Sequence, residues 1–125
     1  MQFQILEILS SIQAELPDVS GYALVSSDGR IIHHDWKGSS VDTGKIGAIA
    51  SALLGLGKKS IEILASGDFQ QVVLQSTEET ICVYSAGSRT VLIVSMNNTG
   101  NLGMLNHICR KKADEIEELT EKEKL

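Results

Sequence analysis

The amino-acid sequence predicts an α+β fold, a three-layer α-β-α sandwich in which helices cover both faces of an antiparallel sheet. The run VLIV at residues 91–94 is apolar without alternation, and a strand of this kind is buried on both faces. A sheet that contains it needs a helical layer on each side. Short connections join the strands within each expected group, which favours antiparallel pairing.

The composition fits one domain with its own core. Of the 125 residues, 42% are hydrophobic, which suffices for a chain of this length. We expect a single domain over residues 1–120 and a charged, frayed tail over residues 121–125. The net charge of −5 and the lack of a basic patch argue against nucleic acid as a partner.

The first element is a helix over residues 2–15. Its apolar residues recur at helical spacing and form one amphipathic face: Ile5, Ile8, Leu9, Ile12 and Leu16. Pro17 ends the helix, because the residue before a proline is pushed out of the helical region. A hairpin follows, with strands over 21–25 and 30–36. Its turn contains Asp28 and Gly29, a strong hairpin signal because glycine supplies a positive φ.

The stretch 42–65 reads as one long helix, capped by Asp42 or Thr43. One broad apolar side covers about half its circumference and comprises Ile46, Ile49, Ala50, Leu53, Leu54, Leu56, Ile61 and Leu64. The opposite side carries the small residues Ala48, Ser51, Ala52 and Gly55. We expect the broad side to lie on the protein's own sheet and the small side to meet a second protein surface. The alternative is a glycine-tolerant helix buried within one domain.

Gly67 suits the left-handed end of this helix. Three strands should follow, over residues 69–75, 80–85 and 89–96. A final helix over residues 101–120 places one apolar face on the sheet, formed by Leu102, Leu105, Cys109, Ala113 and Ile116. The segment from residue 115 onward is highly charged, and we expect it to fray.

No set of residues in the sequence predicts catalysis. His33 and His34 are adjacent on a strand, so they point to opposite faces and do not easily share a metal ion with Asp35. The sequence has no P-loop, no GxGxxG after a strand and no GxSxG motif. Cys82 and Cys109 match no metal spacing and read as buried thiols. We expect no enzymatic activity, no metal and no cofactor.

The sequence contains no apolar segment long enough to span a membrane, and its first residues lack the charged region and apolar run typical of a signal peptide. We therefore expect a cytoplasmic protein without direct membrane insertion.

Arg30 and Arg89 fall at predicted turns. An arginine supplied in trans can stabilise the transition state of a GTPase, but arginines at turns are common.

The remaining signal concerns association. If the strand over residues 69–75 lies at the sheet edge, its open backbone groups form a template for pairing, which no lysine or proline blocks. Edge pairing beside helix pairing would build one two-fold dimer surface. We expect it to include Gly47, Ala48, Ser51, Ala52, Gly55, Val72, Val73 and Leu74. The alternative is an edge covered by the chain's own loops.

The sequence resembles the roadblock family, the dynein-light-chain-like domains that include prokaryotic GTPase regulators. The matching stretches are GYALVSSDGRII, the helix GKIGAIASALLGLGKKS, the three strands up to Met96, and NLGMLNHICRKKADEIEEL. The last resembles the family's Asn-x-Gly-x-Leu pattern, here Asn101, Gly103 and Leu105. The resemblance implies a sheet of five antiparallel strands in the order 2-1-5-4-3. The long helix would lie on one face and the terminal helices on the other.

The resemblance also implies a homodimer, or a heterodimer with a similar chain, formed by the third strand and the middle helix. It further implies a non-enzymatic scaffold or regulator of a small Ras-like GTPase. The surface for this partner would comprise Lys45, Ala48, Ser51, Ala52, Gly55, Lys58, Lys59 and Glu62. Two alternatives remain: a motor or cytoskeletal light chain that binds an extended peptide, and a small hydrolase or ligand-binding domain with a cavity at His33 or His34.

Overall fold

The computed structural model describes residues 2–36 and 41–123, so the loop predicted at 37–40 and the last two residues of the predicted tail lie outside the described part. The elements follow the order α-β-β-α-β-β-β-α. Their bounds are α1 Gln2–Glu15, β1 Val19–Ser26, β2 Ile31–Trp36, α2 Thr43–Leu64, β3 Val72–Gln75, β4 Glu79–Ser85, β5 Thr90–Asn97 and α3 Leu102–Glu123.

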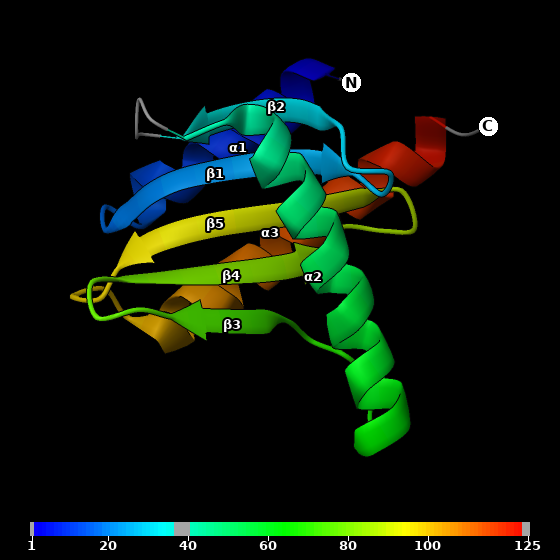
Figure 1. The fold of residues 1–125 in the computed structure, drawn as a ribbon. Helices are drawn as coiled ribbons and strands as arrows, with labels where there is room; N and C mark the ends of the chain where they lie inside the picture. Colours follow the sequence, from blue (N-terminus) through cyan, green and yellow to red (C-terminus); the bar gives the residue numbers. More distant parts are fainter. Residues whose placement is uncertain (1, 37–40, 124–125) are drawn as a thin grey trace.

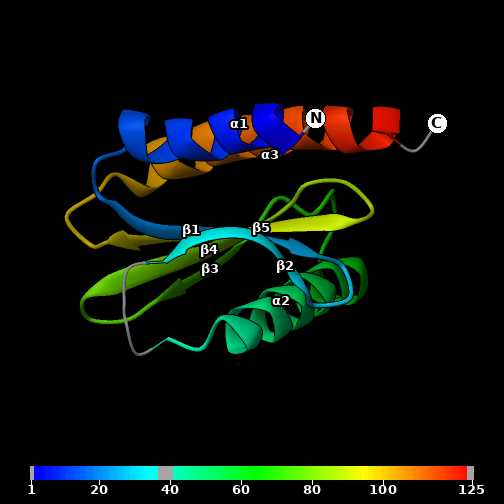
Figure 2. The same cartoon turned by 90° about the horizontal axis from the view of Figure 1, so that it is seen from above.

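The described strands form one antiparallel sheet in the order β2-β1-β5-β4-β3. Helices α1 and α3 lie side by side on one face, and α2 crosses the other face alone (Figures 1 and 2). The central strand β5 is buried along its length except at Asn97. This arrangement confirms the predicted three-layer sandwich and the strand order that the family resemblance implies.

Each helical layer has its own hydrophobic core. Between the sheet and α1/α3, buried side chains include Leu9 and Ile12 of α1, Tyr84 of β4, and Leu105 and Ile116 of α3. Between the sheet and α2, the core is smaller and is built from Ala23, Val25, Ile46, Ala50, Leu54, Val83, Val91 and Ile93. The apolar faces predicted for the first and last helices are therefore confirmed, because their members line the first core.

Two predicted boundaries were wrong for identifiable reasons. Strand β3 begins at Val72, because Phe69 leaves the ladder and packs against the core beneath α2. Helix α3 continues to Glu123, beyond the predicted end at residue 120, so the charged residues 115–123 are helical in the structure. Ile116 is fully buried there and Leu119 packs on the same core. This packing stabilises a charged sequence as a helix, because tertiary contacts outweigh local preference.

Candidate functional site

Helix α2 is the element with the most distinctive surface. Asp42 caps it, because its Oδ1 accepts a hydrogen bond from the backbone N–H of Gly44 at 2.9 Å. This contact satisfies one of the donors left free in the first turn. The helix ends at Leu64, and Gly67 follows with φ +92°, a left-handed conformation that glycine adopts without steric cost.

The inner face of α2 is narrow. Its buried residues are Ile46, Gly47, Ala50 and Leu54. Two glycines allow the close approach. A Cβ on Gly47 would lie 2.1 Å from the carbonyl oxygen of Gly29 in the β1–β2 turn, and one on Gly57 would lie 2.5 Å from Val72 Cγ2. The cost of glycine within a helix, about 1 kcal/mol each relative to alanine, is offset by this packing.

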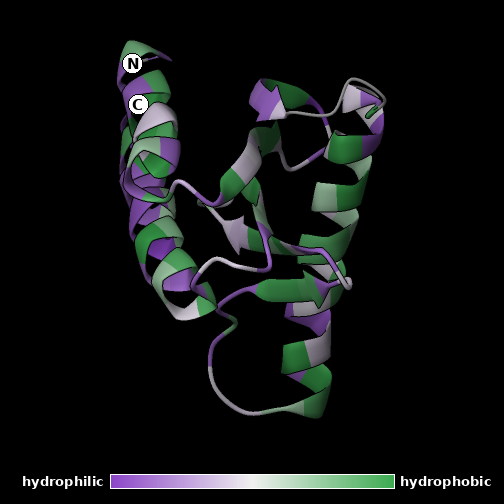
Figure 3. Ribbon diagram, turned by 90° about the vertical axis from the view of Figure 1, so that its left-hand side faces the viewer, coloured by the Kyte–Doolittle hydropathy of each residue, from purple (hydrophilic) through white to green (hydrophobic). Residues whose placement is uncertain are grey.

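The opposite side, which we call the outer face of α2, is apolar and exposed to solvent. Ile49 is 51% exposed, and Leu56 and Ile63 are each 66% exposed. The three residues are spaced by seven, so they lie on one stripe of the helix. Lys45, Ala52 and Lys59 fall on the same stripe and are also exposed. Figure 3 shows hydrophobic segments along α2, which has no helix beside it on its side of the sheet.

The outer face corrects one prediction. The broad apolar side was expected to lie on the sheet, yet Ile49 and Leu56 face solvent and Leu64 is 82% exposed. The helix contacts the sheet along a narrower stripe, formed by Ile46, Gly47, Ala50 and Leu54, and its other side has no described helix packed on it. The seven-residue spacing of Ile49, Leu56 and Ile63 was a readable signal of this stripe. Sequence reasoning missed it by grouping all apolar positions together.

Some residues of the predicted small-residue surface are exposed, whereas others pack against the chain's own β1–β2 turn. Ala48, Ala52 and Gly55 are exposed, as are the predicted partner-facing residues Lys45, Lys58, Lys59 and Glu62. Ser51 is half-buried, and its hydroxyl donates to the backbone oxygen of Ser27 at 2.7 Å. Gly47 is buried against the chain's own turn, so it offers no surface to a second copy.

Strand β3 lies at one edge of the sheet, as the edge-pairing hypothesis requires. Val72 packs on the α2 side and Val73 on the α1/α3 side, while Leu74 is 46% exposed. The C-terminal end of α2 projects beyond this strand (Figure 1). An unpaired strand edge and an exposed apolar helix end therefore lie next to each other.

The histidines do not form a site. His33 lies opposite Leu24 and His34 opposite Ala23, and these β1 residues belong to the cores on opposite faces of the sheet. His33 is half-buried rather than fully solvated, and its Nε2 has no hydrogen-bond partner among the described residues. Across residues 2–36 and 41–123, no group of three His, Cys, Asp or Glu side chains could hold a metal ion.

The two thiols, Cys82 and Cys109, are free and buried, as predicted. Burial raises the pKa of both, that of Cys109 to about 12. A nucleophilic cysteine requires a lowered pKa, so these thiols serve packing.

Within the described part of the chain, no helix is both long and apolar enough to cross a membrane.

The family model of the Roadblock/LC7 domain matches residues 5–95, and the chain belongs to this family. A protein of Methanocaldococcus jannaschii, described as uncharacterized, is 28% identical over 98 residues, which cover 78% of this chain and 84% of that protein. Myxococcus xanthus MglB has the same fold, with a TM-score of 0.83 and 18% identity over 95% of this chain and 96% of that one. A structure of MglB with tetrameric arrangement gives a TM-score of 0.80 at 16% identity, covering 95% and 89% of the two chains.

Proposed function

We propose that this protein is a non-enzymatic adaptor that forms a dimer and binds a small Ras-like GTPase. The observation that carries the proposal is the outer face of α2, where Ile49, Leu56 and Ile63 are exposed beside the open edge of β3. A folded domain rarely leaves an apolar stripe uncovered unless a partner occupies it. Membership of the roadblock family supports a regulatory role in a GTPase pathway.

The dimer would form where two copies of β3 meet. Antiparallel pairing of the two edges would extend each sheet and satisfy the free backbone groups. Because α2 projects beyond β3, its C-terminal end would then overlie the second copy and cover Ile63 and Leu64. Fully burying one such side chain contributes about 1.5–3 kcal/mol. The tetrameric arrangement of the similar MglB structure supports self-association of this fold.

The GTPase would bind the part of the outer face that lies nearer the N-terminus of α2. Lys45, Ala48, Ile49 and Ala52 are exposed there. Small residues let a partner approach closely, while Ile49 supplies an apolar anchor and Lys45 can steer an acidic surface. The free thiols Cys82 and Cys109 fit a reducing compartment, and we expect the complex in the cytoplasm.

The dimer is tested by sedimentation of the wild type and two glutamate variants. Ile63→Glu introduces a charge at the proposed contact and should shift the protein towards monomer at micromolar concentration. Met104→Glu is the matched control, since Met104 is 51% exposed but lies on α3 in the opposite layer. A monomeric wild type, or equal dissociation of both variants, would contradict the proposed dimer.

The GTPase is tested by affinity capture with small GTPases encoded in the same genome, each loaded with GDP or a non-hydrolysable GTP analogue. We expect one of them to bind the wild type in one nucleotide state. Ile49→Glu should abolish that capture, and Met104→Glu should retain it. Absence of nucleotide-dependent binding by every GTPase tested would count strongly against the proposal.

A light-chain function is the second candidate, because the open edge of β3 also suits an extended peptide that adds as a strand. The two functions differ in what occupies the edge. A peptide that competes with dimerisation, together with a lack of GTPase binding, would favour the light-chain function. A dimer that persists while the GTPase binds would favour the regulator.

A further inference from the structure

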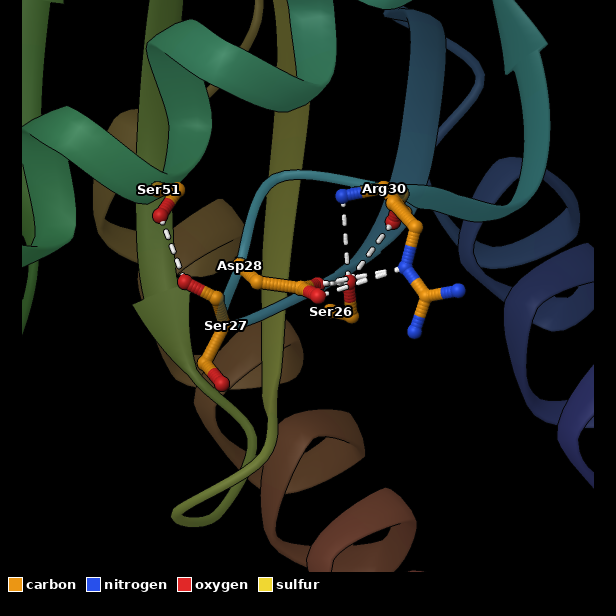
Figure 4. Close-up of polar contacts among 5 residues, drawn as sticks. All are labelled: Ser26, Ser27, Asp28, Arg30 and Ser51. Carbon is orange, nitrogen blue, oxygen red and sulfur yellow. Dashed lines mark hydrogen bonds and ion pairs between the residues drawn. The ribbon is translucent and has the colours of Figure 1, made fainter.

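The β1–β2 turn is fixed against α2 by contacts from both elements. The Ser51 hydroxyl donates to the backbone oxygen of Ser27 at 2.7 Å, as Figure 4 shows. Two residues further along the turn, Gly29 lies against the backbone of Gly47 and Ala48. The turn bends out of the sheet towards the α2 layer (Figure 2). The turn therefore lies beside α2 on the same face of the sheet.

Arg30 ends this turn, and its side chain forms an ion pair with Asp28 of the same turn. Its Nε lies 3.3 Å from Asp28 Oδ2 and also donates to Asp28 Oδ1 at 3.4 Å. Its backbone N–H donates to the Ser26 hydroxyl oxygen at 3.0 Å, and the Ser26 hydroxyl donates to Asp28. The hydrogen bond from Ser26, aided by the charge of Arg30, lowers the pKa of Asp28. The carboxylate that orients Arg30 is therefore ionised at neutral pH.

The outer end of the guanidinium is available for binding. The Arg30 side chain is 81% exposed. Within the described residues, its hydrogen bonds and its ion pair with Asp28 all use Nε, so the two terminal nitrogens have no partner. In Figure 4 the dashed lines from the guanidinium to Asp28 start at Nε, and neither terminal nitrogen carries one. Two parallel N–H donors match the two oxygens of a carboxylate.

We propose that Arg30 binds a surface carboxylate of the GTPase seated on the outer face of α2, and that Asp28 is a positioning residue for it. This inference rests on the proposed function and extends its binding surface from α2 onto the β1–β2 turn. Asp28 would pair with Nε while the terminal nitrogens bind the partner carboxylate, and this pairing would favour the bound rotamer of the arginine. Because the chain carries a net charge of −5, the Arg30 cation on a turn that contacts α2 through Gly29 and Ser27 would give an acidic partner local complementarity.

The test uses the GTPase that the wild-type protein captures. Its dissociation constant and association rate are measured from about 50 to about 500 mM NaCl, a range that spans the Debye length of about 10 Å at 0.1 M. Arg30→Ala should weaken binding about 10-fold at low salt, as expected for one charge-assisted contact. The loss should shrink as salt rises, because screening removes the same attraction from the wild type. Lys111→Ala is the matched control, since Lys111 is an exposed cation on α3 in the opposite layer.

The role of Asp28 is tested by substituting it both in the wild type and in the Arg30→Ala variant. Asp28→Asn keeps an oxygen for the Ser26 hydroxyl but removes the charge that orients Arg30, and it should weaken binding about 3-fold when Arg30 is present. In the Arg30→Ala background the same change should have no further effect. Arg30→Lys keeps the charge but loses the two-pronged geometry, so it should fall between the wild type and Arg30→Ala. Equal melting temperatures of all variants would confirm that folding is unchanged.

Three outcomes would overturn the proposal, and they are distinguishable. If no GTPase binds the wild type, the proposed function fails and this inference fails with it. If the wild type binds but Arg30→Ala binds equally well, only the role of Arg30 fails. If Arg30→Ala keeps full affinity yet loses an acceleration of GTP hydrolysis at saturating protein, the arginine acts on a phosphate rather than on a carboxylate.

Discussion

Gly47 of α2 lies so close to Gly29 of the β1–β2 turn that a Cβ on Gly47 would be 2.1 Å from the Gly29 carbonyl oxygen. The contact is between backbones, so no flexible side chain can move aside to relieve a clash. The pair fixes both the depth of α2 on the sheet and the position of the turn that carries Arg30. Folding and the proposed partner surface therefore depend on the same two glycines.

Gly47→Ala should lower the free energy of unfolding by about 1–3 kcal/mol, because overpacking forces the helix and the turn apart. Gly55→Ala is the control, since a Cβ at Gly55 meets nothing within 4 Å. It should leave stability unchanged or raise it by up to about 1 kcal/mol through helix propensity. Urea denaturation at one fixed protein concentration measures both. Equal effects of the two substitutions would contradict the close approach.

Gly55→Leu separates association from folding. The new side chain has free space within one copy, so each subunit should keep its fold. It would obstruct close approach by a second α2, and the dissociation constant of the dimer should rise at least 10-fold, about 1.4 kcal/mol. Sedimentation equilibrium gives that constant. Unchanged dissociation would show that the small-residue surface lies outside the contact between subunits.

Tyr84→Phe should reduce the free energy of unfolding by about 1–2 kcal/mol. The hydroxyl of this buried residue donates to Asn106 Oδ1 at 2.7 Å and joins β4 to α3. Its removal leaves a partly buried amide oxygen without its donor. Tyr22→Phe is the control, because the Tyr22 hydroxyl makes no hydrogen bond to the described residues, and it should cost less than about 0.5 kcal/mol. A larger loss at Tyr22 would contradict this assignment.

The buried thiols should make stability fall at alkaline pH. Burial, reinforced by Cys82, raises the pKa of Cys109 to about 12, whereas an unfolded thiol ionises near pH 8.5. Between these values the unfolded state has lost a proton that the folded state keeps, so the free energy of unfolding decreases as pH rises. The contribution is complete below about pH 8.5 and is lost as pH approaches 12.

In Cys109→Ala the free energy of unfolding should fall less steeply with pH, by about 1 kcal/mol per pH unit between about pH 9 and pH 11. The upper limit for one group is about 1.4 kcal/mol per pH unit, the free-energy equivalent of one pKa unit. The stability of this variant at pH 7 should be lower, because the substitution leaves a small cavity. Denaturation curves at successive pH values measure both effects. The thiols of the folded wild type should also resist a thiol reagent at pH 8 until urea is added. Rapid labelling of the native protein would contradict their burial.

Asp42→Ala should cost about 1 kcal/mol, since it removes the oxygen that accepts the Gly44 N–H at the start of α2. Asp68→Ala is a charge-matched control at an exposed position in the segment between α2 and β3, and it should change stability by less than about 0.5 kcal/mol. Thermal unfolding at one protein concentration would resolve the difference. Equal shifts for both variants would mean that net charge, rather than the cap, accounts for the effect.

Local rules were sufficient for the order and type of the elements, but not for the start of β3 or the end of α3. The period of Ile5, Leu9 and Ile12, followed by Pro17, correctly predicted both ends of α1. The capping role of Asp42 and the left-handed Gly67 also follow from side-chain and backbone chemistry within a few residues. The unalternating strand 91–94 required helices on both faces, and the structure has them. Each of these features depends either on contacts between residues close in sequence or on burial that the hydrophobic pattern indicates directly.

The sequence by itself thus determined the order of the elements, their helical or extended form, and the need for three layers. Only the tertiary structure decided which residues of α2 face outward. A helical pattern reports where apolar residues lie around the axis, but it contains no information on how wide a strip the sheet can cover. That width depends on contacts between residues far apart in sequence, such as Gly47 with Gly29 and Gly57 with Val72. These contacts bury Ile46 and Leu54, whereas Ile49 and Leu56 stay exposed, because the sheet covers one side of α2 and no second described helix covers the other.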